Sequence, residues 1–194
     1  MSNYKTVFFI LGVLQIILGL SMIVPIMAQF YYNQVDSGFI GSGLVSIIFG
    51  VLFFLSNLDY EKKLTLPQAF LLTALSWLSI AIFGSLPFVF SDLSLSFTNA
   101  FFESMSGITT TGSTILTNLN ETPKAILLWR AMLQWLGGIG IIVMASTLMP
   151  IMNIGGMQLF VISNTHNPEK ILPKSKEISI RLIVIYSSLT LVCA

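Results

Sequence analysis

Charged residues are scarce in this chain: Asp, Glu, Lys and Arg make up only 9% of its 194 residues, whereas 55% are hydrophobic. Soluble domains carry roughly 25% charged residues, so the composition excludes a soluble domain and predicts an all-α polytopic membrane protein. Cysteine is nearly absent too. Because Cys193 stands alone, neither an internal disulfide nor a cysteine-based metal site is expected. The few basic residues form no cluster, which argues against a nucleic-acid partner.

Apolar runs long enough to cross a bilayer recur along the sequence. A helix needs about 20 residues to span a hydrocarbon core about 30 Å thick. Four segments meet this length: residues 7–30, 39–58, 68–90 and 125–149. A fifth apolar run begins near residue 178 and continues to Ala194 without a polar cap. We therefore expect an N-terminal fragment of a longer membrane protein.

These segments divide the chain into four parts. Residues 1–63 are expected to form a leading pair of transmembrane helices. Residues 64–152 are expected to form a unit in which a short helix and a loop lie between two spans. Residues 153–177, rich in Asn, Pro, Lys and Gly, are expected to form a cytoplasmic connector, and residues 178–194 the start of a further membrane helix.

Basic residues lie almost entirely on one side of the predicted spans. The segments on the other side, 31–38 and 91–124, contain only Lys124. Seven basic residues lie on the first side: Lys5, Lys62, Lys63, Lys170, Lys174, Lys176 and Arg181. By the positive-inside rule, the N-terminus is cytoplasmic and the segment 97–114 opens toward the outside.

Small residues recur at helical spacing in the first two spans. Gly12 and Gly19 lie seven residues apart, and Ser42, Ser46 and Gly50 occupy every fourth position. Such spacing places the small residues on one face of each helix, where they let neighbouring helices approach closely. The pattern predicts that these two spans are packing elements.

The segment 97–114 is apolar but too short to cross a bilayer. Ser96 or Thr98 is expected to cap a helix of about ten residues, which is about 15 Å long and ends at Gly107. Irregular backbone at membrane depth is tolerated only where protein or water surrounds it. The chain is therefore expected to enter the membrane from outside and turn back.

The residues after Gly107 are rich in hydroxyl groups: Thr109, Thr110, Thr111, Gly112, Ser113 and Thr114. Gly112 permits the backbone angles that turn successive carbonyl groups toward one ion. Oxygen dipoles without a carboxylate suit a weakly hydrated monovalent cation, whereas a divalent site would require Asp or Glu. The loop is therefore predicted to be a cation filter, with Thr110, Thr111, Gly112 and Ser113 as its ion-binding residues.

Two charged residues lie close to this loop in the sequence pattern. Glu103 belongs to the short helix and Arg130 to the following span. Either the two form a buried or half-buried pair that steadies the short helix, or Arg130 extends to the outer interface. Thr109 is expected to be a further supporting residue. In the same span, Gly137, Gly138 and Gly140 indicate either close packing or a hinge.

Three stretches carry a family resemblance: residues 97–113 (FTNAFFESMSGITTTGS), 128–140 (LWRAMLQWLGGIG) and 155–159 (GGMQL). They resemble the TrkH/TrkG/KtrB family of bacterial potassium transporters. The chain is most similar to the TrkH branch, which has two extra helices before the first repeat, and the resemblance extends over essentially all 194 residues.

The resemblance implies a pore in a bacterial inner membrane, surrounded by four repeats of one polypeptide that each donate a filter strand around a glycine. K⁺ is then the substrate, bound by oxygens of Thr110, Thr111 and Gly112 with Ser113 adjoining, and no covalently bound cofactor is expected. Family members form homodimers and bind a cytosolic nucleotide-binding regulatory subunit of the TrkA or KtrA type. This chain contains one complete repeat, so it cannot enclose such a pore by itself.

Other functions fit the sequence less well. A tetrameric cation channel, in which each chain supplies one filter strand, is the alternative within the transport class. An intramembrane enzyme would need a catalytic pair at membrane depth. Glu103 is the only carboxylate of the short helix and loop, and no span contains a histidine. The chain is therefore not expected to be an enzyme.

Overall fold

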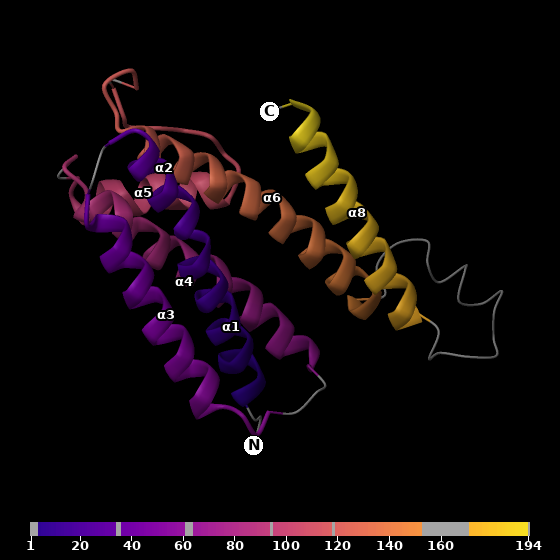
Figure 1. Ribbon diagram of the computed structural model, residues 1–194. Coiled ribbons are helices and arrows are strands. Elements are labelled where there is room, and N and C mark those ends of the chain that lie inside the picture. The colour runs from indigo at the N-terminus through magenta and orange to yellow at the C-terminus, as the bar shows by residue number, and fades with distance from the viewer. Residues whose placement is uncertain are drawn as a thin grey trace. The chain divides into compact units, whose positions relative to one another are not determined.

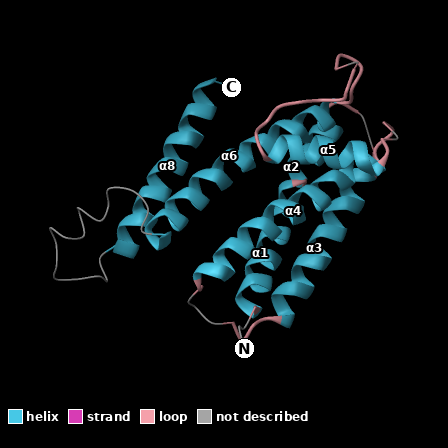
Figure 2. Cartoon of the chain, turned by 180° about the vertical axis from the view of Figure 1, so that it is seen from behind, coloured by secondary structure: helices cyan, strands magenta, loops and turns pink. Residues whose placement is uncertain are grey.

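A computed structural model gives the fold and describes residues 4–33, 36–60, 64–93, 95–117, 119–152 and 171–193 (Figure 1). All regular secondary structure in these ranges is helical (Figure 2). The helices are α1 (Lys5–Ser21), α2 (Ile23–Tyr31), α3 (Gly38–Ser56), α4 (Leu66–Phe90), α5 (Phe97–Ile108), α6 (Lys124–Met152) and α8 (Ile171–Cys193).

Four helical segments are long and apolar enough to cross a membrane, as the sequence predicts. They are Lys5–Tyr31, Gly38–Ser56, Leu66–Phe90 and Lys124–Met144. The first was expected as one helix, but the structure divides it into α1 and α2 at Met22. Pro25 explains the break, because it has no N–H to donate to the carbonyl of Ser21, where α1 ends.

The fifth predicted segment is also helical, but it begins earlier than expected. Helix α8 starts at Ile171 rather than near residue 178, so the end of the predicted connector is part of the helix. Its apolar portion, Ile180–Cys193, is shorter than the four spans. The rest of the predicted connector, residues 153–170, lies outside the described residues.

The chain divides into two compact units, Met1–Gly137 and Gly138–Ala194. The first contains α1 to α5 and the first half of α6, and the second contains the rest of α6 and α8. In the first unit, α5 lies at the end of the helical bundle opposite the N-terminus (Figure 1).

Helices α1 and α3 pack along the predicted small residues. A Cβ atom built on Gly12 would lie 2.7 Å from the carbonyl oxygen of Gly50, and one built on Gly19 would lie 2.9 Å from that of Gly43. Ser42 and Ser46, both on α3, are buried as well. The close approach of the two leading helices is therefore confirmed.

A core at one end of this unit supports α5. It contains side chains from five of the helical segments, the largest being Trp129, Phe39, Phe88 and Met22. Farther along the bundle, the Gln15 amide on α1 donates a hydrogen bond to the Ser79 hydroxyl on α4. This polar contact joins the leading helix pair to the first helix of the repeat.

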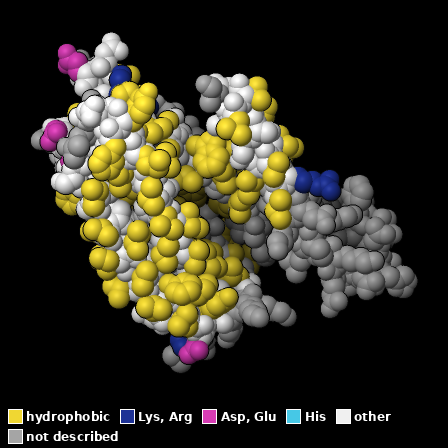
Figure 3. Space-filling view, in the orientation of Figure 1, with side chains coloured by type: hydrophobic (Ala, Val, Ile, Leu, Met, Phe, Trp, Pro, Cys, Tyr) yellow, Lys and Arg dark blue, Asp and Glu magenta, His cyan; other side chains and the backbone are white. Residues whose placement is uncertain are grey.

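The surface of the bundle is strongly apolar. On the visible face of the first unit, hydrophobic side chains extend along the length of the helices, and the charged side chains lie toward the two ends (Figure 3). The exposed residues include Ile17, Leu20, Leu44, Leu52 and Leu55. Apolar side chains on the outside suit contact with lipid. The backbone N–H and C=O groups inside each helix are hydrogen-bonded within that helix, as lipid also requires.

Candidate functional site

The short helix predicted after the third span is α5, with 12 residues. Its length is about 18 Å, too short to cross a bilayer. The Ser96 side chain accepts a hydrogen bond from the backbone N–H of Asn99 at 3.3 Å, which confirms one of the two predicted caps. The helix ends at Ile108, one residue beyond the expected Gly107.

Two backbone hydrogen bonds end α5 and begin the loop. The N–H of Thr110 donates to the carbonyl of Gly107 at 2.9 Å, and that of Thr111 donates to the carbonyl of Ser106 at 3.1 Å. This pair of bonds defines a Schellman motif, whose left-handed position is usually glycine. Here it is Thr110, with φ +59°. A β-branched residue in this conformation is strained, and residues with such backbone strain are often found at functional sites.

The loop after the helix end is exposed and rich in oxygen. Gly112 also has a positive φ, +80°, as its predicted role in turning the backbone requires. The hydroxyl groups of Thr109 and Thr111 are hydrogen-bonded to each other at 2.9 Å. The carbonyl oxygens of Thr110 and Thr111 accept no hydrogen bond from the part of the chain that the structure describes. These two oxygens are available to a cation.

Glu103 and Arg130 form a close ion pair. Arg130 Nε donates to Glu103 Oε2 at 2.9 Å, and the side chains are 0% and 16% exposed for Glu103 and Arg130, respectively. The second carboxylate oxygen accepts from the Thr114 hydroxyl at 2.7 Å and from the Ile115 N–H at 2.5 Å. Of the two arrangements that the sequence left open, the pairing is confirmed.

Arg130 also binds the loop directly. Its Nη2 donates to the carbonyl oxygens of Gly112 at 2.9 Å and Ser113 at 3.0 Å. The Ser106 hydroxyl donates to the same oxygen of Ser113 at 2.6 Å. The loop is thus held in two ways: the N–H groups of Thr110, Thr111 and Gly112 donate to carbonyls of α5, and the carbonyls of Gly112 and Ser113 accept from side chains.

Close helix packing places Arg130 beside the loop. Leu133 lies one turn farther along α6. A Cβ atom built on Gly107 of α5 would lie 3.1 Å from its side chain, and one built on Gly84 of α4 would lie 3.2 Å from it. The Trp129 indole N–H donates to the carbonyl of Gly84 at 2.9 Å. A Cβ atom on Gly137 would overlap the Ile108 carbonyl group. For Gly137, the packing interpretation is confirmed.

All seven residues singled out from the sequence therefore lie at this site: Glu103, Thr109, Thr110, Thr111, Gly112, Ser113 and Arg130. Their roles toward an ion stay predictions. Sequence reasoning missed Ser106 and the contacts of Thr114 and Ile115 with Glu103. The only signal for Ser106 was a hydroxyl residue two positions before the end of a short apolar helix.

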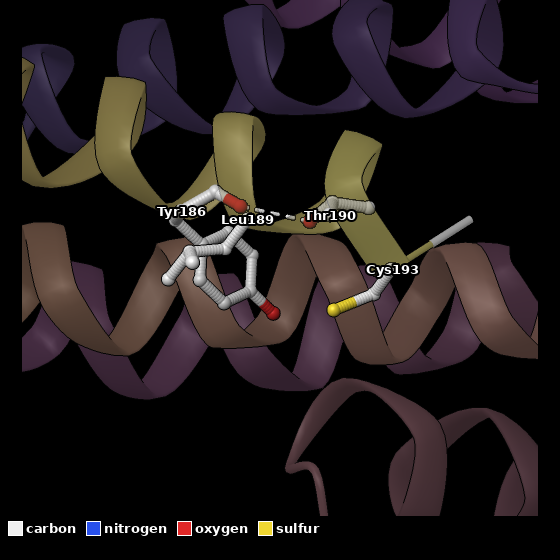
Figure 4. Close-up of a pocket in the computed structure, with 4 residues that line it drawn as sticks. All are labelled: Tyr186, Leu189, Thr190 and Cys193. Atoms are coloured by element: carbon white, nitrogen blue, oxygen red, sulfur yellow. Dashed lines mark hydrogen bonds between the residues drawn. The ribbon is translucent and has the colours of Figure 1, made fainter.

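A separate pocket lies on α8, in the second unit. Tyr186, Leu189, Thr190 and Cys193 line it, at the spacing of one helix face (Figure 4). The Thr190 hydroxyl donates to the Tyr186 carbonyl at 2.8 Å, an ordinary intrahelical contact. Within the described ranges, no three His, Cys, Asp or Glu side chains gather where they would hold a metal ion.

Comparison with known proteins finds relatives of this chain. The family model of TrkH, described as a cation transport protein, matches residues 5–194. The Trk system potassium uptake protein TrkH of Vibrio parahaemolyticus is 37% identical over 196 aligned positions, covering 99% of this chain and 40% of that protein. TrkI of Halomonas elongata is 37% identical over 186 positions, covering 95% of this chain and 38% of that protein.

A solved structure agrees with these sequence relatives. The crystal structure of the potassium transporter TrkH from Vibrio parahaemolyticus superposes with a TM-score of 0.84 at 33% identity. The match covers 98% of this chain and 38% of that one. The chain therefore spans about 40% of the length of the curated relatives it matches.

Proposed function

Because the chain belongs to the TrkH family of cation transport proteins, we propose that it contributes one filter strand to the pore of a potassium uptake protein. The observation that supports this most directly is the interruption after α5. A short helix ends in a strained turn, and the next two carbonyl oxygens, of Thr110 and Thr111, have no donor among the described residues. These two carbonyl oxygens can therefore bind an ion instead of a hydrogen-bond donor of the protein.

The chemistry of the strand suits K⁺. Carbonyl and hydroxyl oxygens of Thr110, Thr111 and Gly112, with Ser113 adjoining, replace part of the hydration shell of the ion. K⁺ is weakly hydrated, so neutral oxygen dipoles offset its dehydration while leaving it free to move on. The C-terminal end of α5, which carries partial negative charge, adds to the attraction.

The charged pair keeps this site close to neutral. Glu103 is fully buried and bonded to Arg130, so its carboxylate does not face the ion as a free charge. A free carboxylate would bind a divalent cation and hold a monovalent one too tightly for rapid release. The pairing therefore favours conduction of a monovalent cation.

One strand does not make a pore. We propose that the remaining strands come from further repeats of the same polypeptide in a bacterial inner membrane, with a cytoplasmic N-terminus. The apolar surface of the bundle supports lipid contact. A homodimer and a cytosolic nucleotide-binding subunit of the TrkA or KtrA type are proposed as partners on the family resemblance alone.

The test is rescue of a potassium-uptake-deficient bacterium at low external K⁺, using the complete gene that encodes this chain. Wild type is expected to restore growth, and Gly112→Asp is expected to abolish it, because a Cβ strains the backbone at φ +80° and the carboxylate traps the cation. Asn120→Asp, which adds the same charge at an exposed position nearby, is the control and should grow. Growth of Gly112→Asp at the wild-type rate would contradict the assignment.

The native mass of the active complex distinguishes the two pore architectures. A pore built from repeats of one chain is expected to give an active complex whose native mass corresponds to one or two copies. Four copies per active complex would favour the tetrameric channel instead.

A further inference from the structure

We propose that Arg130 is a positioning residue that sets the discrimination between K⁺ and Na⁺ at this strand, by fixing Gly112 and Ser113 against α5. The inference rests on the proposed function and deepens it. Its basis is that a single guanidinium bonds both the pore helix and the loop.

The geometry uses the fork of an arginine side chain. Nε donates to Glu103, and the two hydrogens of Nη2 are directed to the carbonyls of Gly112 and Ser113. Three of the five N–H groups are thus committed at fixed mutual angles. The spacing between α5 and the loop is therefore determined by a planar, rigid group rather than by a flexible one.

Selectivity needs such rigidity because K⁺ and Na⁺ differ mainly in size. A loop whose carbonyls move inward by a few tenths of an ångström accommodates the smaller ion as well. On the other side of the loop, the Thr110 and Thr111 carbonyls have no protein donor among the described residues to hold them. Their peptide units are held from both sides: the N–H groups of Thr111 and Gly112 donate to the Ser106 carbonyl at 3.1 and 3.3 Å, and Arg130 holds the carbonyls that follow.

Glu103 neutralises the guanidinium in this arrangement. Its carboxylate accepts three hydrogen bonds, from Arg130, Thr114 and Ile115. Without that negative charge, Arg130 would present an uncompensated cation beside the ion path and repel K⁺. The two residues are thus expected to give different transport defects, although they form one pair.

The experiment measures rubidium uptake as a probe of K⁺ transport, with and without competing Na⁺, in cells that express the complete gene. Membrane content of each variant is quantified by immunoblot. Arg130→Lys keeps the charge but removes the fork, so the ratio of the Na⁺ inhibition constant to the KM for the probe should fall about tenfold, as expected for one lost charge-assisted hydrogen bond. Lys124→Gln, a charge loss at the start of the same helix, should keep the wild-type ratio.

Glu103→Gln provides the second readout. It should raise the KM for rubidium by about tenfold at an unchanged ratio of Na⁺ inhibition constant to KM, because the unpaired guanidinium repels both ions. A merely structural pair would instead lower the maximal rate and the membrane content in both variants, with the ratio and KM unchanged.

Three results would overturn the inference. The first is a wild-type ratio in Arg130→Lys. If that variant is missing from the membrane, Ser106→Ala takes its place, since it removes the other side-chain hydrogen bond that holds the Ser113 carbonyl, and a wild-type ratio there is the second. The third is absence of rubidium uptake by wild type, which refutes the proposed function itself and is thereby distinguished from failure of the inference alone.

Discussion

Gly137 on α6 packs directly against the carbonyl group of Ile108, the last residue of α5. A Cβ atom built on Gly137 would overlap the oxygen of that group and lie 2.7 Å from its carbon. Only a residue without a side chain lets α6 approach the end of the short helix so closely. The contact fixes α6 at the point where the loop after α5 begins.

Replacing Gly137 with alanine should therefore force the two helices apart. Overpacking of this kind costs about 2 kcal/mol, and we expect a lower unfolding temperature in detergent together with reduced K⁺ uptake. Gly140→Ala is the matched control, because no atom of the described residues lies within 4 Å of a Cβ at that position. Similar losses in the two variants would show that the Gly137 contact is not the cause.

Much of the fold was predictable from the sequence because bilayer thickness and helical spacing are local rules. The four spans, the short helix capped by Ser96 and the packing faces of Gly12 and Gly19 all follow from run length and periodicity. The break at Met22 also had a local signal, Pro25, but the long apolar run around this proline favoured a single helix.

The site was predictable in its membership but not in its bonding. Which loop carbonyls Arg130 holds depends on where its Nη2 atom lies. That position is set by the packing of Gly137, Leu133 and Trp129 on α6. Contacts between residues 17 or 18 positions apart leave no periodic trace in one sequence. The left-handed Thr110 was equally hidden, since glycine, not threonine, is the usual signal for that conformation.

The seam between α1 and α3 gives a second prediction. A Cβ atom on Gly12 would lie 2.6 Å from the backbone nitrogen of Phe54, so Gly12→Ala should separate the helices and cost about 1–3 kcal/mol. Gly41→Ala on α3 meets no described atom within 4 Å and should be neutral. Thermal unfolding of the purified protein in detergent compares them. An unchanged midpoint for Gly12→Ala would contradict the packing of these helices.

Thr110 offers a prediction of unusual sign. At most positions alanine is more stable than glycine, but a left-handed backbone penalises any Cβ by about 1 kcal/mol. Thr110→Gly should therefore unfold at a higher temperature than Thr110→Ala, both variants having lost the same hydroxyl. At Thr109, where φ is −78°, the order of the glycine and alanine variants should be the ordinary one. The same order at both positions would mean that Thr110 is not strained.

Trp129 allows the support beneath the loop to be tested without touching the loop itself. Its side chain is fully buried, packs edge-on against Phe39 and donates to the Gly84 carbonyl. Trp129→Phe removes that hydrogen bond and leaves a cavity, so a loss of about 2 kcal/mol is expected, together with weaker K⁺ uptake as α6 loosens against α4. Trp77→Phe, on a partly exposed face of α4, should change the unfolding temperature little. Equal shifts for both tryptophans would show that the bond to Gly84 does not position α6.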